Sequence, residues 1–343
     1  MKKLLLDKTH QAYHITRTLS YVGEYKLVQN FTKLFSPWVQ VPDVPQDQRD
    51  KRDMILQDIK AMYEEDATLF SEGILPYSVL TPESPLKHLK RLPKIMLASV
   101  RMGRQRKLNI TRPSHSEEGL PDYFKRNFHW QIDGYLSRES AELYNHQVEI
   151  LFTGTAQAMR RLIFKPLYEA IKDKKPEDVQ ILEVAAGTGE ISESVSKAFP
   201  KMNYTISDLS RAYLSGAQER LKNRKVNFIQ AAAEDLPFKD QSQDVVFSVF
   251  LFHEIPSSVR EKAIQEAFRV LKPQGRLIIV DSIQKQDMPD YQWALYRFPI
   301  DYHEPFYKGY TEWDMTQTLK EAGFGEPQTK RGFLTKCVWV DKP

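Results

Sequence analysis

From about residue 177 onward, the chain alternates short apolar runs with amphipathic stretches. Apolar runs of this length predict β-strands, and the stretches between them carry apolar residues at helical spacing. The alternation is typical of an α/β fold, here a doubly wound, mainly parallel sheet of seven strands. We expect strands near 179–185, 203–207, 225–230, 244–251, 275–281, 326–331 and 333–340, and helices near 190–199, 210–222, 257–271 and 311–322.

The first half of the chain has helical periodicity instead. Residues 1–175 are predicted to be mainly helical, with proline-rich breaks near 37–45 and 111–121. A length of 343 residues suits two folding regions. We therefore expect a helical N-terminal extension over 1–137 and an α/β domain over 138–343.

Charge is unevenly distributed along the chain. Residues 1–130 contain 21 Lys and Arg against 15 Asp and Glu, whereas the remaining residues contain 28 against 30. Much of the excess lies in residues 86–112, which contain no acidic residue and are named the basic segment below. Its apolar residues recur every three or four positions, which predicts a basic amphipathic helix that Pro93 starts, kinks or splits. These residues are Leu86, Leu89, Leu92, Met96 and Val100.

The basic segment has three interpretations. A solvated helix face is the simplest, contact with an anionic membrane surface is the second, and contact with nucleic acid phosphates is the third. No RNA-binding motif accompanies the segment, so nucleic acid is the least favoured partner. The single cysteine, Cys337, excludes an internal disulfide and fits a reducing compartment. We expect a cytoplasmic protein; if it makes peripheral contact with the inner membrane surface, the basic segment is the expected point of contact.

A glycine turn after the first predicted strand carries the strongest chemical signal. Residues 183–191 leave the strand at an acid, Glu183, and turn through Gly187 and Gly189 into a helix. Such a turn lets a ligand approach the backbone next to the free N–H groups of a helix start. A dinucleotide site requires a third glycine, where this chain has Ser192. Glu183 would repel a pyrophosphate but could bind an amino group, which favours S-adenosylmethionine.

Four blocks of sequence together resemble the class I S-adenosylmethionine-dependent methyltransferases. The resemblance is greatest to the ubiquinone/menaquinone C-methyltransferase-like group, also described as methyltransferase type 11, and it covers about residues 140–340. It implies a Rossmann-like methyltransferase sheet, S-adenosyl-L-methionine as cofactor, S-adenosyl-L-homocysteine as product, and no metal. The blocks are ILEVAAGTG at 181–189, YTISDLS at 204–210, AAEDLPF at 232–238 and RVLKPQGRL at 269–277.

The resemblance also implies roles for individual residues. The glycines would give access to the methionine part of the cofactor beside Glu183, and Asp208 would accept hydrogen bonds from both ribose hydroxyls. Ala233 and Glu234 would bracket the adenine, and Ala185 stands where many relatives have glycine. The cofactor-binding residues expected in this way are Glu183, Ala185, Gly187, Gly189, Asp208, Leu209, Ala233, Glu234 and Phe250.

Candidates for the chemistry of transfer lie at the fourth strand and after the fifth. His253 follows the fourth strand and is a candidate base or acceptor-orienting group, while Glu254 is predicted to cap the next helix. The irregular, aromatic-rich stretch 291–310 would form a binding wall, with His303 and Glu304 as its ionisable pair. A further aromatic cluster at 123–135 either closes the cofactor pocket, through Trp130, Asp133 and Tyr135, or packs on the core.

The sequence therefore predicts a methyltransferase that acts on a small, apolar or aromatic metabolite. Methyl transfer needs an aligned acceptor and removal of any acidic proton, and it needs no metal. Two alternatives remain open: an RNA-modifying methyltransferase that uses the basic segment, and a catalytically silent cofactor-binding or assembly protein. The protein could form an oligomer under any of these three functions.

Overall fold

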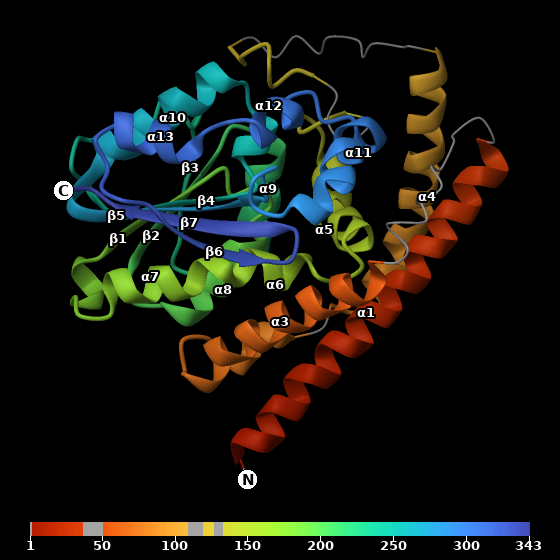
Figure 1. Cartoon of the computed structure of the whole chain (residues 1–343), viewed down its shortest axis with the longest axis horizontal. Helices are drawn as coiled ribbons and strands as arrows, with labels where there is room; N and C mark the ends of the chain where they lie inside the picture. Colours follow the sequence, from red (N-terminus) through yellow and green to blue (C-terminus); the bar gives the residue numbers. More distant parts are fainter. Residues whose placement is uncertain (1, 37–50, 82, 109–118, 127–132) are drawn as a thin grey trace.

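The described residues form one central sheet with helices on both faces (Figure 1). The structure is a computed structural model that describes residues 2–36, 51–81, 83–108, 119–126 and 133–343. In this part of the chain the sheet has seven strands in the order β3-β2-β1-β4-β5-β7-β6. The strands are β1 (Gln180–Val184), β2 (Asn203–Asp208), β3 (Asn227–Gln230), β4 (Gln243–Val249), β5 (Leu271–Ser282), β6 (Gln328–Gly332) and β7 (Thr335–Asp341).

The pairing of the strands confirms the predicted doubly wound, mainly parallel sheet. β1 pairs in parallel with β2 and with β4, β2 with β3, and β4 with β5. β7 is antiparallel to both β5 and β6, so a hairpin ends the sheet. The central strands are buried on both faces, which explains their nearly continuous apolar sequence.

Two hydrophobic clusters cover opposite faces of the sheet. Ile181 of β1 packs in one cluster with residues of α7 (Phe164–Ile171), α8 (Glu190–Ala198) and α9 (Arg211–Arg220). Its neighbour Leu182 packs in the other with α10 (Ser257–Val270) and α13 (Met315–Glu321). Successive side chains of a strand point to opposite faces, so one strand contributes to both clusters. Figure 1 shows α7 and α8 on one side of the sheet and α10 and α13 on the other.

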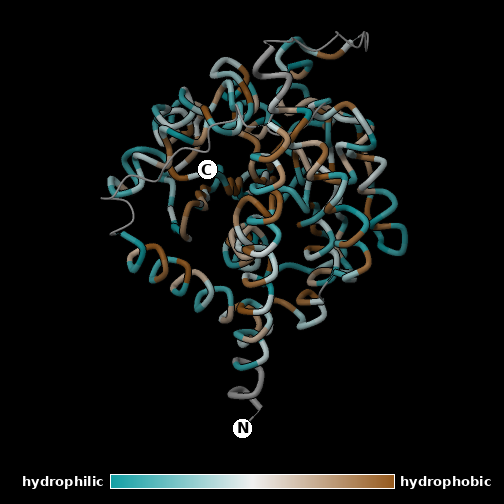
Figure 2. The backbone as a smooth tube through the Cα atoms, turned by 90° about the vertical axis from the view of Figure 1, so that its right-hand side faces the viewer, coloured by the Kyte–Doolittle hydropathy of each residue, from teal (hydrophilic) through white to brown (hydrophobic). Residues whose placement is uncertain are grey.

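The N-terminal extension is helical, as predicted. It contains α1 (Lys2–Phe35), α3 (Arg52–Ser71), the 3-10 turn η1 (Tyr77–Leu80) and α4 (Pro85–Leu108). α1 packs against α3, α4 and α5 (Arg138–Leu151), and its N-terminal end extends away from the body of the molecule (Figures 1 and 2). Further short helices lead into the sheet: α6 (Ala156–Arg160), η2 (Arg161–Ile163) and η3 (Pro176–Asp178).

Helix α4 contains most of the basic segment, whose residues 109–112 lie outside the described residues. Pro93 lies inside the helix and does not split it. Proline removes one N–H donor, and the carbonyl that loses this bond belongs to Leu89, an exposed residue with access to water. None of the described helices is long and apolar enough to cross a membrane.

A buried ionic cluster fastens the extension to the α/β domain. Asp66 of α3 accepts two hydrogen bonds from Arg161, at 2.6 and 2.7 Å, and both residues are almost fully buried. His10 and His14 of α1 contact the same carboxylate at 2.8 and 3.2 Å. The ion pair holds the pKa of Asp66 well below its usual range, against the opposing effect of burial. The division of the chain at residue 137 stays a prediction, and these contacts cross it.

The stretch after β5 is more regular than the sequence indicates. We expected an irregular segment up to residue 310, but it forms η5 (Pro289–Tyr291), α11 (Gln292–Tyr302) and α12 (Tyr307–Thr311). α11 contains Pro299 and carries aromatic residues on several faces, so no clear helical period stands out in the sequence. A further 3-10 turn, η4 (Phe252–Glu254), follows β4.

Candidate active site

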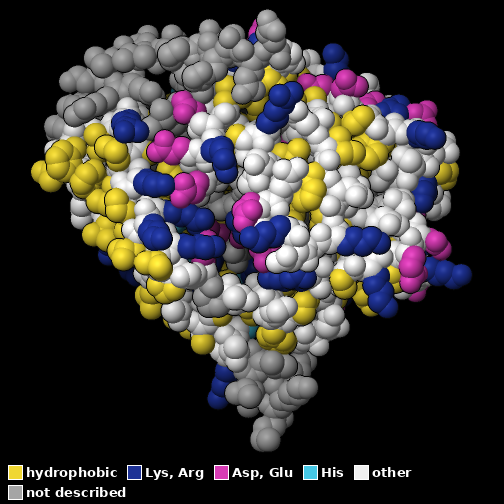
Figure 3. Space-filling view, turned by 180° about the vertical axis from the view of Figure 1, so that it is seen from behind, with side chains coloured by type: hydrophobic (Ala, Val, Ile, Leu, Met, Phe, Trp, Pro, Cys, Tyr) yellow, Lys and Arg dark blue, Asp and Glu magenta, His cyan; other side chains and the backbone are white. Residues whose placement is uncertain are grey.

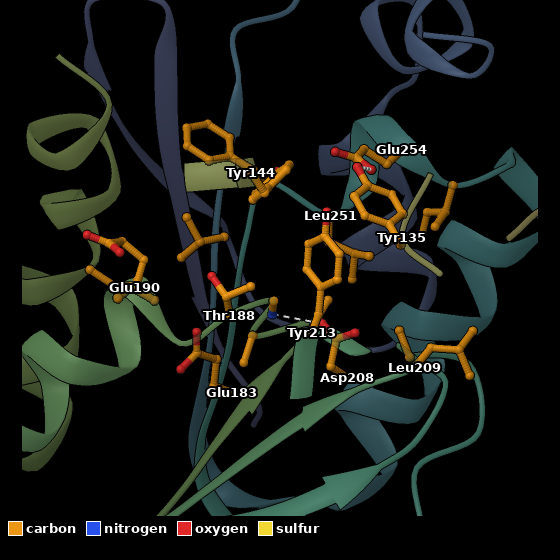
Figure 4. A pocket seen from close by; sticks show the side chains of 18 of the residues that line it. Tyr135, Tyr144, Glu183, Thr188, Glu190, Asp208, Leu209, Tyr213, Leu251 and Glu254 are labelled. Atoms are coloured by element: carbon orange, nitrogen blue, oxygen red, sulfur yellow. Dashed lines mark hydrogen bonds between the residues drawn. The ribbon is translucent and has the colours of Figure 1, made fainter. Parts of the chain in front are cut away.

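A cavity of about 1000 Å³ lies at the carboxyl ends of β1, β2, β3 and β4. β1 and β4 are neighbours, although β2 and β3 come between them in the sequence, so the chain changes direction across the sheet at this point. Ligands of open α/β sheets bind in the crevice that this change creates. Figure 4 shows the side chains that converge on this space, which we name the cofactor cavity.

The glycine turn after β1 forms the floor of the cofactor cavity. Gly187 has φ = 58° and lines the cavity, as does Ala185 with φ = 57°. The N–H of Gly187 donates to Oδ2 of Asp208 at 2.7 Å, and the N–H of Ala186 donates to the carbonyl of Ser207 at 2.9 Å. A left-handed backbone favours glycine, so alanine at position 185 adopts a conformation that side chains rarely take.

Glu183 is buried at the end of β1 and lines the cavity. The Ser192 hydroxyl donates to its Oε2 at 2.6 Å, and the Tyr204 hydroxyl donates to the same oxygen. Burial raises the pKa of Glu183 to about 7, although the two hydroxyls lower it. Ser192, which stands where a dinucleotide site has glycine, therefore positions the acid that distinguishes this cavity.

Asp208 ends β2 and holds the turns on either side of it. Its Oδ2 accepts from Gly187, and its Oδ1 accepts from the N–H of Ser210 at 2.7 Å. Burial raises the pKa of Asp208 to about 6, against the effect of these two backbone donors. Its place at the strand end, on the cavity wall, suits the expected contact with a ribose.

Most of the expected cofactor-binding residues line this cavity, but two do not. Gly189 is the N-cap of α8, where an added Cβ would lie 3.2 Å from Cβ of Ala217. Its role in the structure is to let α8 pack against α9. Glu234 accepts a hydrogen bond from the Tyr123 hydroxyl at 2.6 Å and lies behind that ring. The expected residues on the wall are Glu183, Ala185, Gly187, Asp208, Leu209, Ala233 and Phe250.

Tyrosine side chains from outside the glycine turn cover the cavity. Tyr135 precedes α5, Tyr144 lies in α5 and Tyr213 lies in α9. Their rings contact one another with centroids 5.3 to 6.0 Å apart, and Figure 4 shows Tyr135 beside Glu254. Tyr135 was expected from the cluster at 123–135, whereas Trp130 lies outside the described residues. Tyr144 and Tyr213 carry no signal in the sequence that separates them from core aromatic residues.

A second cavity, of about 650 Å³, adjoins the first and is named the acceptor cavity. Three residues line both cavities: Tyr144, Phe250 and Glu254. Its other walls are mainly apolar and aromatic, and the described lining contains no Lys or Arg. The remaining lining residues are Val148, Leu151, Phe152, His253, Ser282, Ala294, Leu295, Phe298, Tyr307, Leu334 and Thr335.

His253 lines the acceptor cavity and is held by Asp281. Nδ1 of His253 lies 2.5 Å from Oδ1 of Asp281, which is fully buried at the end of β5. Burial alone would lower the pKa of His253, but the Asp281 carboxylate and the nearby Glu254 and Glu304 raise it above its ordinary value. Asp281 was not predicted as a site residue, although an acid at the carboxyl end of a predicted strand is a recognisable signal.

The other ionisable candidates have different positions from those expected. Glu254 does not cap α10, whose N-cap is Pro256; it is buried on the wall of both cavities and accepts from the Tyr135 hydroxyl. Glu304 is buried near His253 and affects its pKa, but it is not part of either lining. His303 is exposed at the end of α11 and outside both linings, so the structure does not bring it to the site.

A third cavity, of about 570 Å³, continues from the acceptor cavity toward the N-terminal extension. The two share Tyr144, Val148 and Leu151, all from α5. The third cavity is almost entirely apolar and is closed by Tyr25 and Val28 of α1 and by residues of α4 and α11. The extension therefore forms part of the space next to the candidate site.

Comparisons with known proteins agree with this geometry. A family model described as a methyltransferase domain matches residues 181–275. The ubiquinone/menaquinone biosynthesis C-methyltransferase UbiE of Rhizobium etli is 31% identical over 139 residues, which cover 39% of this chain and 53% of that protein. The protein of the same name from Bartonella tribocorum is 39% identical over 107 residues, covering 30% and 40%.

Among solved structures, the chain is similar to the SAM dependent methyltransferase from Aquifex aeolicus, with 22% identity and a TM-score of 0.39. The likeness covers 52% of this chain and 88% of that one. The chain spans about half the length of the curated relatives that it matches.

The sheet order and the match over residues 181–275 support the Rossmann-like fold of a class I S-adenosylmethionine-dependent methyltransferase. Over this region the chain is similar to the UbiE-like type of these enzymes.

Proposed function

We propose that this protein transfers the methyl group of S-adenosylmethionine to a small, apolar or aromatic molecule bound in the acceptor cavity. The observation that carries the proposal is the wall shared by the two cavities, formed by Tyr144, Phe250 and Glu254. A sulfonium methyl in the first cavity and an acceptor in the second would meet at these residues. Methyl transfer is an in-line displacement, so such alignment is the main requirement of the reaction.

The lining of the acceptor cavity supports an acceptor without a strong negative charge. Apolar and aromatic side chains predominate, and no cation is present in the described lining to bind a phosphate or carboxylate. Phe250 and Tyr144 present ring surfaces that suit a sulfonium ion and an aromatic acceptor. The same lining argues against a nucleic acid acceptor, whose phosphates need basic partners.

His253 is the residue best placed to act on the acceptor. With Nδ1 fixed by Asp281, its Nε2 lies on the other side of the ring, 3.7 Å from Oε1 of Glu254. In the neutral form, Nε2 could take a proton from a phenol, an enol or an activated carbon as the methyl group arrives. Glu254 and Tyr307 are further polar groups in the same cavity that could orient the acceptor.

The apolar third cavity supports an acceptor that carries a hydrocarbon substituent. It adjoins the acceptor cavity, with which it shares Tyr144, Val148 and Leu151. Burial of a hydrocarbon chain there would stabilise the complex by about 0.8 kcal/mol for each CH₂ group. This arrangement gives the N-terminal extension a role in binding the substrate.

Cofactor binding and transfer can be tested separately. S-adenosylhomocysteine should raise the melting temperature, because a ligand of the native state stabilises it by mass action. Transfer should then be measured with radiolabelled S-adenosylmethionine and a series of phenols and hydroquinones that carry alkyl chains of increasing length. If S-adenosylhomocysteine has no effect on melting, the proposal is wrong. Binding without transfer to any acceptor would support the catalytically silent protein, and transfer to structured RNA would support the RNA-modifying enzyme.

A variant that fills the acceptor cavity makes the test specific. Ala294 of α11 lines the acceptor cavity but not the cofactor cavity, so Ala294→Trp should stop transfer and leave the affinity for S-adenosylhomocysteine unchanged. Tyr296→Trp is the matched control, because Tyr296 is 70% exposed on the same helix. Equal loss of activity in both variants would contradict the proposed acceptor site.

A further inference from the structure

A cluster of metal-ligand side chains lies outside both cavities of the candidate active site. Glu24 of α1 lies between two histidines, His88 of α4 and His146 of α5. Its Oε1 is 2.9 Å from Nδ1 of His88, and its Oε2 is 2.5 Å from Nε2 of His146. One ligand atom from each residue lies within 4.8 Å of the other two. We propose that this triad binds a divalent transition-metal ion, with zinc as the preferred ion.

The types of ligand in the triad match that choice. Imidazole nitrogen suits zinc and its transition-metal neighbours, and two histidines with one glutamate form a known zinc ligand set that leaves a fourth position for water. Ligands bound at about 2.1 Å in tetrahedral geometry lie about 3.4 Å apart. The atoms of the triad need only small side-chain movements to reach that separation, since they already lie within 4.8 Å. The Glu24 carboxylate would offset half the charge of the ion.

Glu83 lies near the second ring nitrogen of His88, whereas the second ring nitrogen of His146, Nδ1, is buried without a hydrogen-bond partner in the described structure. Oε2 of Glu83 lies 3.6 Å from Nε2 of His88, the ring nitrogen that would not bind the ion. A ligating histidine usually donates its second N–H to a carboxylate, which fixes the orientation of the ring. Arg91 holds Glu83 in place with hydrogen bonds of 2.8 and 2.9 Å to its two oxygens.

A polar cleft gives the triad a path to solvent. The cleft has a volume of about 1100 Å³, and both His146 and Glu83 line it. Charged side chains from α1, α4, α8 and α9 form its walls, and Figure 3 shows Lys, Arg, Asp and Glu gathered around a hollow on that side of the molecule. An ion can therefore enter, and water can complete its coordination.

A second group of the same residue types shows what excludes a metal ion. His10, His14 and Asp66 also converge, but Arg161 binds both oxygens of Asp66, and its Nη2 lies 3.5 Å from Nε2 of His14. The guanidinium group is always charged and stands where a cation would have to bind. Beside the triad, Arg91 is held by Glu83, and the ion pairs of Glu24 among the described residues are those with its two histidines.

The proposed ion would act on the architecture and not on methyl transfer. It would join α1, α4 and α5 at one point, and α5 carries Tyr144 and Asn145 on the wall of the cofactor cavity. The sequence does not reveal this site, because positions 24, 88 and 146 lie far apart and follow no ligand-spacing motif. Only the packing of three helices brings the ligands together.

Direct metal binding tests the proposal. Untagged, metal-free protein should bind one equivalent of Zn²⁺ in calorimetry, and Co²⁺ should give the visible absorption bands of a low-symmetry nitrogen and oxygen site. Glu24→Gln and His88→Ala should each weaken Zn²⁺ binding at least 100-fold and abolish the Co²⁺ bands. S-adenosylhomocysteine binding should persist in both variants, which shows that they remain folded.

Two histidine variants provide the controls. His303→Ala removes an exposed histidine, and His14→Gln alters the group occupied by Arg161; both should bind one Zn²⁺ as the wild type does. The proposal is overturned if the wild type binds no Zn²⁺ below millimolar concentration. It is also overturned if Glu24→Gln and His88→Ala bind Zn²⁺ as tightly as the controls.

Discussion

Two residues at the site have a backbone conformation that side chains rarely adopt. Ala185 has φ = 57° and Phe250 has φ = 60°, and both line the cofactor cavity. Such conformations cost on the order of 1 to 3 kcal/mol each and persist only when the surrounding contacts require them. Phe250 donates its N–H to the carbonyl of Val280 at 2.8 Å, which holds its backbone next to β5, and the residue lines both cavities.

The charge on Asp208 should be needed for cofactor binding. Asp208→Asn keeps the shape of the side chain but lowers its capacity to accept hydrogen bonds from a ribose and from Gly187. We expect the affinity for S-adenosylhomocysteine to fall by about 10- to 100-fold in calorimetry, equivalent to about 1.4 to 2.7 kcal/mol. Glu234→Gln, outside the cavity wall, should change the affinity little. An unchanged affinity in Asp208→Asn would mean that the ribose is held elsewhere.

Glu183 should make the unliganded protein less stable at neutral pH than at acid pH. Its pKa is raised from 4.5 to about 7 in the folded state, so folding favours the neutral form. The stabilisation of the folded state by the neutral carboxyl is present below pH 4.5 and is lost as the pH rises to about 7. The free energy of unfolding should fall by up to about 3 kcal/mol, since each unit of pKa shift corresponds to about 1.4 kcal/mol. Urea unfolding at pH 5 and pH 8 should show a smaller difference in Glu183→Gln than in the wild type. If the change in stability between pH 5 and pH 8 is equal in the two proteins, a group other than Glu183 causes it.

His253 should determine the acid limb of the pH profile of transfer. Its pKa is raised, so the neutral form needed by a base appears only above the ordinary histidine value of about 6.5. In Asp281→Asn, the limb in kcat/KM should move to lower pH. His253→Gln should remove the limb and lower kcat about 10²- to 10⁴-fold. If single-turnover rates with saturating cofactor are unchanged in His253→Gln, alignment alone performs the reaction.

At the scale of elements, Leu92, Met96 and Val100 of the expected apolar face pack inside the protein, and we propose that the exposed leucines of α4 contact a membrane surface. Leu86, Leu89 and Leu97 are exposed by 58%, 69% and 46%, and Lys90 and Lys94 are exposed on the same helix. The wild type should sediment with vesicles that contain phosphatidylglycerol, more strongly at low salt, and not with phosphatidylcholine alone. Changing the three leucines to glutamine should reduce binding several-fold. Leu56→Gln is the matched control, because Leu56 is 52% exposed on α3. Equal binding by the wild type and all variants would mean that the exposed face of α4 is only solvated.

For the molecule as a whole, the sequence predicts the sheet better than the site. The spacing of apolar residues correctly predicts the doubly wound sheet. The ends of the predicted strands place Glu183 and Asp208 on the cavity wall, because the carboxyl ends of strands meet in such folds. The role of Gly189 in cofactor binding stays a prediction, and only the packed helices show that an added Cβ there would lie against Ala217. The tyrosine cover and the triad around Glu24 depend on contacts between distant segments, which local patterns do not contain.

The buried ion pair between Asp66 and Arg161 has a consequence for how the chain folds during synthesis. Asp66 and the two histidines beside it leave the ribosome 95 or more residues before Arg161 does. Until then, the carboxylate has no counter-charge, so α1 and α3 cannot close around it without leaving a charge unpaired. The first part of the chain to be made should thus be among the last to dock, and its apolar surfaces should need protection from aggregation meanwhile.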